Sequence, residues 1–84
     1  MPAEHPVALT LYSRSGCHLC EDMQAQLAAL SAEHGFVLQC IDIDADAALV
    51  QRYGSRVPVL MRGETLICEY FLELPALMKA LEQA

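Results

Sequence analysis

The sequence has no tryptophan, few basic residues and no long apolar run. Five Lys and Arg residues stand against eleven Asp and Glu residues, which gives a formal net charge of −6. A nucleic-acid-binding protein needs a basic face for phosphates, so we expect no nucleic-acid partner. No stretch approaches the roughly 20 apolar residues that cross a bilayer, so we also expect no membrane span.

The first residues lack the signature of export. Residues 1–6 contain no Lys or Arg ahead of an apolar stretch, so we expect no secretory signal and a cytoplasmic protein. The chain also contains no internal repeat and no low-complexity segment. Its 84 residues have room for one compact domain, so residues 1–84 are predicted to form a single domain.

Four cysteines are present, but only Cys17 and Cys20 lie close together in the sequence. In a reducing compartment, such a C-x-x-C pair indicates redox chemistry or metal binding rather than a structural disulfide. Structural zinc normally takes four Cys or His ligands in two paired sets, and no second pair is present in the sequence. Redox chemistry is therefore favoured, and no metal site is predicted. Cys40 and Cys68 stand alone in apolar stretches and are predicted to be buried small apolar residues.

The apolar pattern predicts a strand and then a helix in the first part of the chain. Val7 to Tyr12 is short and apolar, and the polar and glycine residues 13–16 follow it, as expected for a buried strand that ends in a loop. From about Cys17 the spacing becomes helical, and Gly35 is the predicted C-terminal cap. The apolar face of this helix is formed by Leu19, Met23, Leu27 and Leu30.

The rest of the chain alternates short apolar runs with turns and helical spacing. Asp42, Asp44 and Asp46 suit helix capping, because the glycine and the final glutamate of a calcium loop are missing. The turn at residues 62–64 favours a hairpin between the two strands that flank it. The predicted elements are a strand at Phe36–Ile43, a helix at Asp46–Tyr53, strands at Val57–Met61 and Thr65–Phe71, and a helix at Leu74–Leu81.

These elements follow one another in the order β-α-β-α-β-β-α. A strand–helix–strand crossover makes the first two strands parallel, with a right-handed connection. The hairpin near the C-terminus adds antiparallel strands to the same sheet. We therefore predict an α/β fold with a central mixed four-stranded sheet flanked by three helices.

Cys17 falls where the first strand ends and the first helix begins, and this placement matters chemically. The unpaired N–H groups and the positive dipole end of a helix stabilise a thiolate and lower the pKa of a thiol there. Cys20 lies about one turn further on, close enough for a disulfide yet less exposed. Cys17 would then attack a substrate disulfide, and Cys20 would attack Cys17 to release the reduced substrate.

Two segments of the sequence resemble glutaredoxins and glutaredoxin-like proteins of the thioredoxin fold. Residues 12–20 (YSRSGCHLC) look like the active-site segment, and residues 53–60 (YGSRVPVL) look like the second signature, a Val-Pro before the third strand. The resemblance implies that Cys17 is the nucleophile, Cys20 the resolving cysteine and Pro58 the family's cis-proline. It implies that Val57 offers its backbone N–H and C=O to an extended substrate. Arg14 matches a basic residue common three positions before the nucleophile.

Two departures from the family pattern bear on glutathione. His18 and Leu19 stand where many glutaredoxins have Pro-Tyr, and residues 69–73 (EYFLE) replace a Gly-Gly-x-x-Asp stretch that helps to hold glutathione. Glu69 would repel a carboxylate of glutathione at this position. Glutathione therefore remains one candidate electron donor beside a reductase, and no bound cofactor is predicted. The family's strand order would place Cys40 and Cys68 at opposite edges of the sheet.

Three further side chains are candidate substrate-binding residues. Arg14 and Arg56 flank the two signature motifs, so they would stabilise the thiolate and attract an anionic substrate if the motifs meet in space. The alternative is that both are solvated surface arginines. His18 would stabilise the thiolate as an imidazolium or accept its proton, or it is an exposed residue in a turn.

The sequence thus predicts a monomeric thiol–disulfide oxidoreductase that acts on a protein disulfide or a small thiol substrate. Two alternatives stay open. In the first, Cys17 ligates a metal or an iron–sulfur cluster that the protein carries. In the second, the chain is a non-catalytic adaptor with incidental cysteines.

Overall fold

The computed structural model describes residues 6–82, and the predicted order of elements is confirmed. The expected lack of a secretory signal rests largely on residues 1–5, which lie outside the described residues. The elements are β1 (Ala8–Ser13), α1 (His18–His34), β2 (Val37–Asp42), a short 3-10 helix η1 (Ile43–Ala45), α2 (Ala47–Tyr53), β3 (Val59–Arg62), β4 (Thr65–Glu69) and α3 (Leu74–Glu82).

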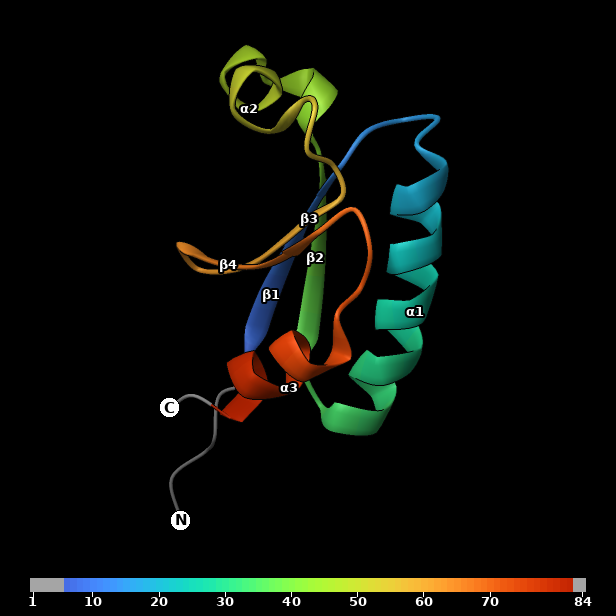
Figure 1. Cartoon of the computed structure of the whole chain (residues 1–84), viewed down its shortest axis with the longest axis vertical. Coiled ribbons are helices and arrows are strands. Elements are labelled where there is room, and N and C mark those ends of the chain that lie inside the picture. Colours follow the sequence, from blue (N-terminus) through green and yellow to red (C-terminus); the bar gives the residue numbers. More distant parts are fainter. Residues whose placement is uncertain (1–5, 83–84) are drawn as a thin grey trace.

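The four strands form one mixed sheet in the order β2-β1-β3-β4. β1 pairs with β2 in parallel, and β3 pairs with both β1 and β4 in antiparallel orientation. The predicted hairpin is thus confirmed as β3 and β4, and Gly63 supplies the positive φ (59°) that its turn requires. Figure 1 shows α1 alongside the sheet, with α2 near one end of the molecule and α3 near the other.

The strand directions bring three chain segments together at one end of the sheet, where β1 and β4 end and β3 begins. Tyr12 near the end of β1 lies opposite Val59 at the start of β3, and Val59 lies opposite Glu69 at the end of β4. Three segments therefore meet at this end of the sheet: the loop that leads to α1, the loop that leads to β3 and the chain that leaves β4. They contain residues 14–17, 54–58 and 70–73, respectively.

Two apolar clusters lie on opposite faces of the sheet, because successive side chains of a strand alternate between its faces. Leu9, Leu11 and Leu60 belong to the larger cluster, which packs against α1 and α3. Val59 and Met61 belong to the smaller cluster, which packs against η1 and α2 through Ile43 and Tyr53. The predicted helical face of α1 is confirmed, with Met23 and Leu27 buried and Leu19 and Leu30 half-buried.

The predicted caps are confirmed at Gly35, Asp42 and Asp46, whereas the Asp44 carboxylate pairs with Arg14 instead. Gly35 ends α1 in the left-handed region (φ 76°), and its N–H donates to the carbonyl of Ser31 at 2.8 Å. The Asp42 carboxylate accepts from the N–H of Asp44, and the Asp46 carboxylate accepts from the N–H of Ala48, both at 2.9 Å. These aspartates therefore cap η1 and α2.

The prediction for Cys68 is confirmed, whereas that for Cys40 is wrong. Cys68 is 3% exposed and belongs to the larger cluster together with Leu77 of α3. Cys40 is exposed and belongs to neither cluster, whereas α3 packs against β4 and covers Cys68. β2 and β4 are the two edges of the sheet, so these cysteines lie on opposite edges, as expected.

Candidate functional site

Cys17 is the N-terminal cap of α1. Its backbone is extended (φ −87°, ψ 107°), and its sulfur accepts a hydrogen bond from the N–H of Cys20 at 3.1 Å. Its carbonyl accepts the first helical hydrogen bond, from the N–H of Glu21, also at 3.1 Å. The sulfur thus lies against the unpaired donors of a helix start, where negative charge is stabilised.

Cys17 and Cys20 form a disulfide, with their Cα atoms 5.2 Å apart. Cys17 is half-buried, whereas Cys20 is 2% exposed. The expected difference in accessibility between the two thiols is therefore present. Cys17 is the more accessible residue of the pair.

Pro58 follows a cis peptide bond, as the resemblance implied. It is fully buried at the end of the sheet where β3 begins and β1 ends. The predicted third strand begins at Val59 rather than Val57, because its pairing with β1 and β4 starts at Val59 and the preceding Pro58 has no N–H to donate to a strand ladder. The carbonyl of Pro58 accepts a hydrogen bond from the N–H of Tyr70 at 2.9 Å, so this loop is tied to the chain that leaves β4.

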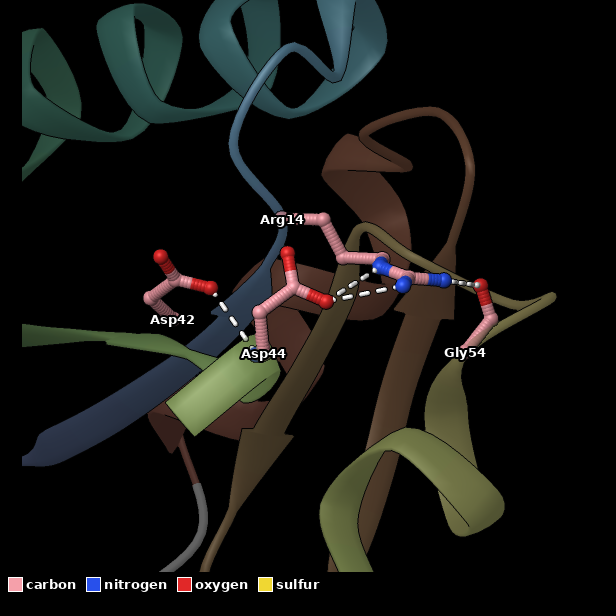
Figure 2. A network of polar contacts seen from close by, with 4 residues as sticks. All are labelled: Arg14, Asp42, Asp44 and Gly54. Atoms are coloured by element: carbon pink, nitrogen blue, oxygen red, sulfur yellow. Dashed lines mark hydrogen bonds and ion pairs between the residues drawn. The ribbon is translucent and has the colours of Figure 1, made fainter. Parts of the chain in front are cut away.

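Arg14 extends from the loop before Cys17 toward η1 and α2 (Figure 2). Its Nε and Nη2 atoms lie 2.9 and 2.8 Å from Oδ1 of Asp44, and its Nη1 donates to the carbonyl of Gly54 at 3.4 Å. The carbonyl of Arg14 accepts from the N–H of Cys17 at 3.2 Å. Arg14 therefore fixes the loop before Cys17 to η1 and to the end of α2, and its positive charge is paired with the Asp44 carboxylate.

Arg56 is also paired with an acid. Its Nε contacts the Glu69 carboxylate, and its guanidinium carbon lies 5.5 Å from the centre of the Tyr53 ring. Both arginines thus share their charge with a carboxylate, and their action on the thiolate or on an anionic substrate stays a prediction. Spacing along the sequence could not reveal this pairing, because both acidic partners come from distant elements.

His18, the other predicted substrate-binding side chain, points away from the protein. Its side chain is 87% exposed, and its Nε2 lies 3.9 Å from Oδ2 of Asp22, one helical turn further on. The sequence left open whether His18 contacts the sulfur or lies in solvent. The geometry matches the solvent-exposed alternative.

A family model described as "Glutaredoxin-like domain (DUF836)" matches residues 8–82. The chain belongs to this glutaredoxin-like family. Uncharacterised proteins of Mycobacterium bovis and Mycobacterium tuberculosis are 39% identical to it over 56 residues, which is 61% of this chain and 58% of each relative. The chain thus spans little more than half the length of these curated relatives in the matched region.

Solved structures support the same assignment for this glutaredoxin-like chain. A solution structure of a protein from Nitrosomonas europaea is 37% identical, with a TM-score of 0.83 and coverage of 98% of this chain and 99% of that one. A crystal structure from X. campestris is 41% identical, with a TM-score of 0.65 and coverage of 90% and 97%. The thioredoxin Deadhead of Drosophila melanogaster is 21% identical over 90% and 81% of the two chains, with a TM-score of 0.60, and shows the thioredoxin-like fold alone.

Sequence reasoning missed the conformation of Tyr70 in this glutaredoxin-like chain. Tyr70 has a positive φ of 66°, and the N–H of Phe71 donates to the carbonyl of Glu69 at 2.7 Å around it. The Tyr70 hydroxyl donates to the carbonyl of Ser55 at 2.9 Å. One signal could have revealed this: Glu69 and Tyr70 stand where the family has glycines, which adopt positive φ readily.

The other two cysteines, Cys40 and Cys68, both have raised thiol pKa values. Burial raises the pKa of the Cys68 thiol; a hydrogen bond with the Glu73 backbone partly offsets this, and the charges of Glu73 and Glu69 add to the increase. Partial burial also raises the pKa of Cys40. Within residues 6–82, no three His, Cys, Asp or Glu side chains come together as a metal site. No helix in the same range is long and apolar enough to span a membrane.

Proposed function

We propose that this chain is a thiol–disulfide oxidoreductase in which Cys17 is the nucleophile and Cys20 the resolving cysteine. The observation that carries the proposal is the position of the Cys17 sulfur, which caps α1 and accepts the N–H of Cys20 at 3.1 Å. The same donor and the helix dipole stabilise a thiolate at Cys17 in the reduced protein. Burial of Cys20 keeps it from competing for substrate.

The proposed reaction moves two electrons from the protein dithiol to a substrate disulfide. The Cys17 thiolate attacks one substrate sulfur, the substrate S–S bond breaks, and the first substrate thiolate leaves and takes up a proton. Cys20 then loses its proton, and its sulfur attacks the Cys17 sulfur of the mixed disulfide. The second substrate thiol leaves, and the Cys17–Cys20 disulfide of the described structure is formed.

The substrate would lie along the loop before β3. Val57 would pair its backbone with an extended substrate next to Pro58, whose cis bond lies at the same end of the sheet as Cys17. Arg14, Arg56 and His18 would lie around this contact. Because Arg14 and Arg56 are paired with Asp44 and Glu69, we propose that they position the loops more than they attract anions.

The oxidised protein must be reduced again by a thiol. Either two molecules of a monothiol such as glutathione or a dithiol reductase of the thioredoxin type would supply the two electrons. The proposed enzyme acts as a monomer in the cytoplasm, without a bound cofactor, nucleic acid or membrane. Turnover measured with reduced glutathione alone, and then with a thioredoxin-type reductase and its reductant, identifies the donor.

A direct test uses three variants and a small neutral disulfide, bis(2-hydroxyethyl) disulfide. Cys17→Ser is expected to lower the rate of reduction more than about a hundredfold, because it removes the attacking sulfur. Cys20→Ser is expected to accumulate a mixed disulfide on Cys17, visible by mass spectrometry. The matched control is Cys40→Ser, an exposed cysteine outside the site, which should react as the wild type does. Wild-type rates in Cys17→Ser would disprove the mechanism.

The metal-carrier alternative would need ligands beyond those that residues 6–82 bring together in one chain. It predicts a coloured or metal-containing dimer after anaerobic purification, with Cys17 of two chains at one cluster. Absorption spectra and metal analysis separate this alternative from the redox proposal.

The adaptor alternative instead predicts a Cys17 that alkylates at neutral pH no faster than an ordinary thiol.

A further inference from the structure

A groove beside the disulfide separates α1 from the chain that joins β4 to α3. Leu19, Asp22, Met23 and Gln26 line it on the helix side, and residues 70–72 line it on the other. Figure 1 shows this connecting chain running next to α1. The groove has a volume of about 230 Å³, below the range of most small-molecule sites, so it suits a single large side chain. It begins at Leu19, the residue immediately before Cys20.

The rim of this groove is unusually apolar for an exposed surface. Five large hydrophobic residues are exposed in the described part of the chain, and two of them, Tyr70 and Phe71, line this groove. A third, Leu74, lines an adjoining hollow that shares Gln26 and Leu72 with the groove. Phe71 is 67% exposed. Exposed apolar residues that gather in one place mark an interaction surface, whereas single ones need no explanation.

The groove wall is held in a strained and fixed conformation. Tyr70 adopts a positive φ that costs a non-glycine residue free energy. Its backbone N–H donates to Pro58, and its hydroxyl donates to the carbonyl of Ser55, both at 2.9 Å. The wall that presents Phe71 is therefore attached to the loop that carries the cis-proline, so a substrate at Cys17 meets both.

The charge at the groove is negative. Asp22 lines the groove, and its contact with His18 is a distant one, with Nε2 3.9 Å from Oδ2 of Asp22. Glu21 and Glu73, which are close to the lining residues in the sequence, are exposed. None of the described residues that line the groove is a lysine or an arginine, and Arg14 and Arg56 are already paired with Asp44 and Glu69. A basic group is therefore attracted here, and a carboxylate is repelled.

We propose that this groove is a specificity subsite for protein disulfides, taking a large apolar side chain next to a lysine or arginine. The inference rests on the proposed function, because the occupant must be joined to the disulfide that Cys17 attacks. Glutathione has no large apolar side chain and carries a carboxylate at each end. Oxidised glutathione is therefore expected to be reduced more slowly than a protein disulfide that has a large apolar side chain next to a lysine or arginine.

The test uses the protein reduced beforehand and two peptides with one internal disulfide each. The peptides differ only next to a cysteine, where one has Leu-Lys and the other Ser-Glu. Bis(2-hydroxyethyl) disulfide and oxidised glutathione serve as references. The wild type is expected to reduce the Leu-Lys peptide about tenfold faster than the Ser-Glu peptide and than oxidised glutathione, as burial of one large side chain predicts.

Two groove variants and one matched control complete the experiment. Phe71→Ala and Asp22→Asn are each expected to lower the ratio between the two peptides severalfold. Leu66→Ala changes another exposed apolar residue, 44% exposed on β4 and outside this groove, and should keep the wild-type ratio. Equal rates for both peptides, or faster reduction of oxidised glutathione, would overturn the inference while leaving the function intact. Failure to reduce any of the four disulfides would remove the proposed function, and this inference with it.

Discussion

The guanidinium of Arg14 holds the carboxylate of Asp44 through two nitrogens, across 30 positions of sequence. The same guanidinium reaches the carbonyl of Gly54 at the end of α2. The loop between β1 and α1 is thereby attached to the elements that follow β2, on the far side of the sheet from α1. Because the Arg14 carbonyl also accepts the N–H of Cys17, this attachment reaches Cys17 directly.

Removal of either partner of this pair is expected to affect stability only modestly. The two side chains are 38% and 40% exposed, and exposed ion pairs contribute about 0.2–1 kcal/mol. Arg14→Gln and Asp44→Asn should each lower the free energy of unfolding by about 1 kcal/mol or less. A double-mutant cycle, measured by urea denaturation, should give a coupling within the same range.

Activity distinguishes bracing from direct action at the sulfur. If Arg14 braces the loop, Arg14→Gln and Asp44→Asn lower the reduction rate by similar, severalfold amounts, because both loosen the same contact. A loss above about tenfold in Arg14→Gln alone would instead show that its charge acts on the thiolate.

The sequence was sufficient for the elements and their order, because these depend on local signals. The helical spacing from Leu19 to Leu30, the caps at Gly35 and Asp46, and the turn at Gly63 are each determined by a few neighbouring residues. Element ends were displaced by one or two residues where the cis bond and the turn at Tyr70 interrupt the strands.

Long-range pairing could not be predicted in the same way. The motifs located Arg14 and Arg56 in the loops before α1 and β3, but their carboxylate partners come from η1 and from the end of β4. Cys40 and Cys68 look alike in sequence, since both stand in apolar runs. Only the packing of α3 against β4 separates the buried Cys68 from the exposed Cys40.

The strain at Tyr70 can be isolated with two substitutions. Tyr70→Ala and Tyr70→Gly both remove the ring and its hydrogen bond to Ser55, but only glycine adopts a φ of 66° without cost. The glycine variant should therefore be more stable than the alanine variant by about 1 kcal/mol or more, as judged by thermal and urea unfolding. Equal stabilities would mean that Tyr70 is not strained in solution.

The two free cysteines should differ sharply in reactivity. With the Cys17–Cys20 disulfide intact, a maleimide is expected to modify the exposed Cys40 at least about a hundredfold faster than Cys68. Cys68 is 3% exposed and reacts only when the protein opens. Peptide mapping by mass spectrometry measures both rates, and Cys40→Ala serves as the control that leaves a single slow site.

Cys68 should also contribute to the loss of stability in alkaline solution. Its pKa is raised in the folded protein above the ordinary value of 9.0, so the unfolded chain loses this proton first as the pH rises. The contribution to stability is complete below pH 9 and declines above it, since the folded state then binds more protons than the unfolded state. Cys68→Ala should flatten the fall in unfolding free energy above pH 9. An unchanged slope would mean that Cys68 titrates normally.

Substitutions of Cys17 separate its chemical role from its structural one. In the disulfide form, the Cys17 sulfur caps α1 through the N–H of Cys20, and we expect this contact to persist in the reduced protein, where a serine oxygen would make it at least as well. Cys17→Ser should therefore keep close to wild-type stability, whereas Cys17→Ala should lose about 0.5–2 kcal/mol, the usual cost of an absent cap. Both variants lack the nucleophile and should be equally inactive toward disulfides. Urea denaturation of the reduced proteins measures the first difference, and the bis(2-hydroxyethyl) disulfide assay checks the second. A stable, inactive Cys17→Ser protein would show that activity depends on the sulfur itself and not on the integrity of the helix start.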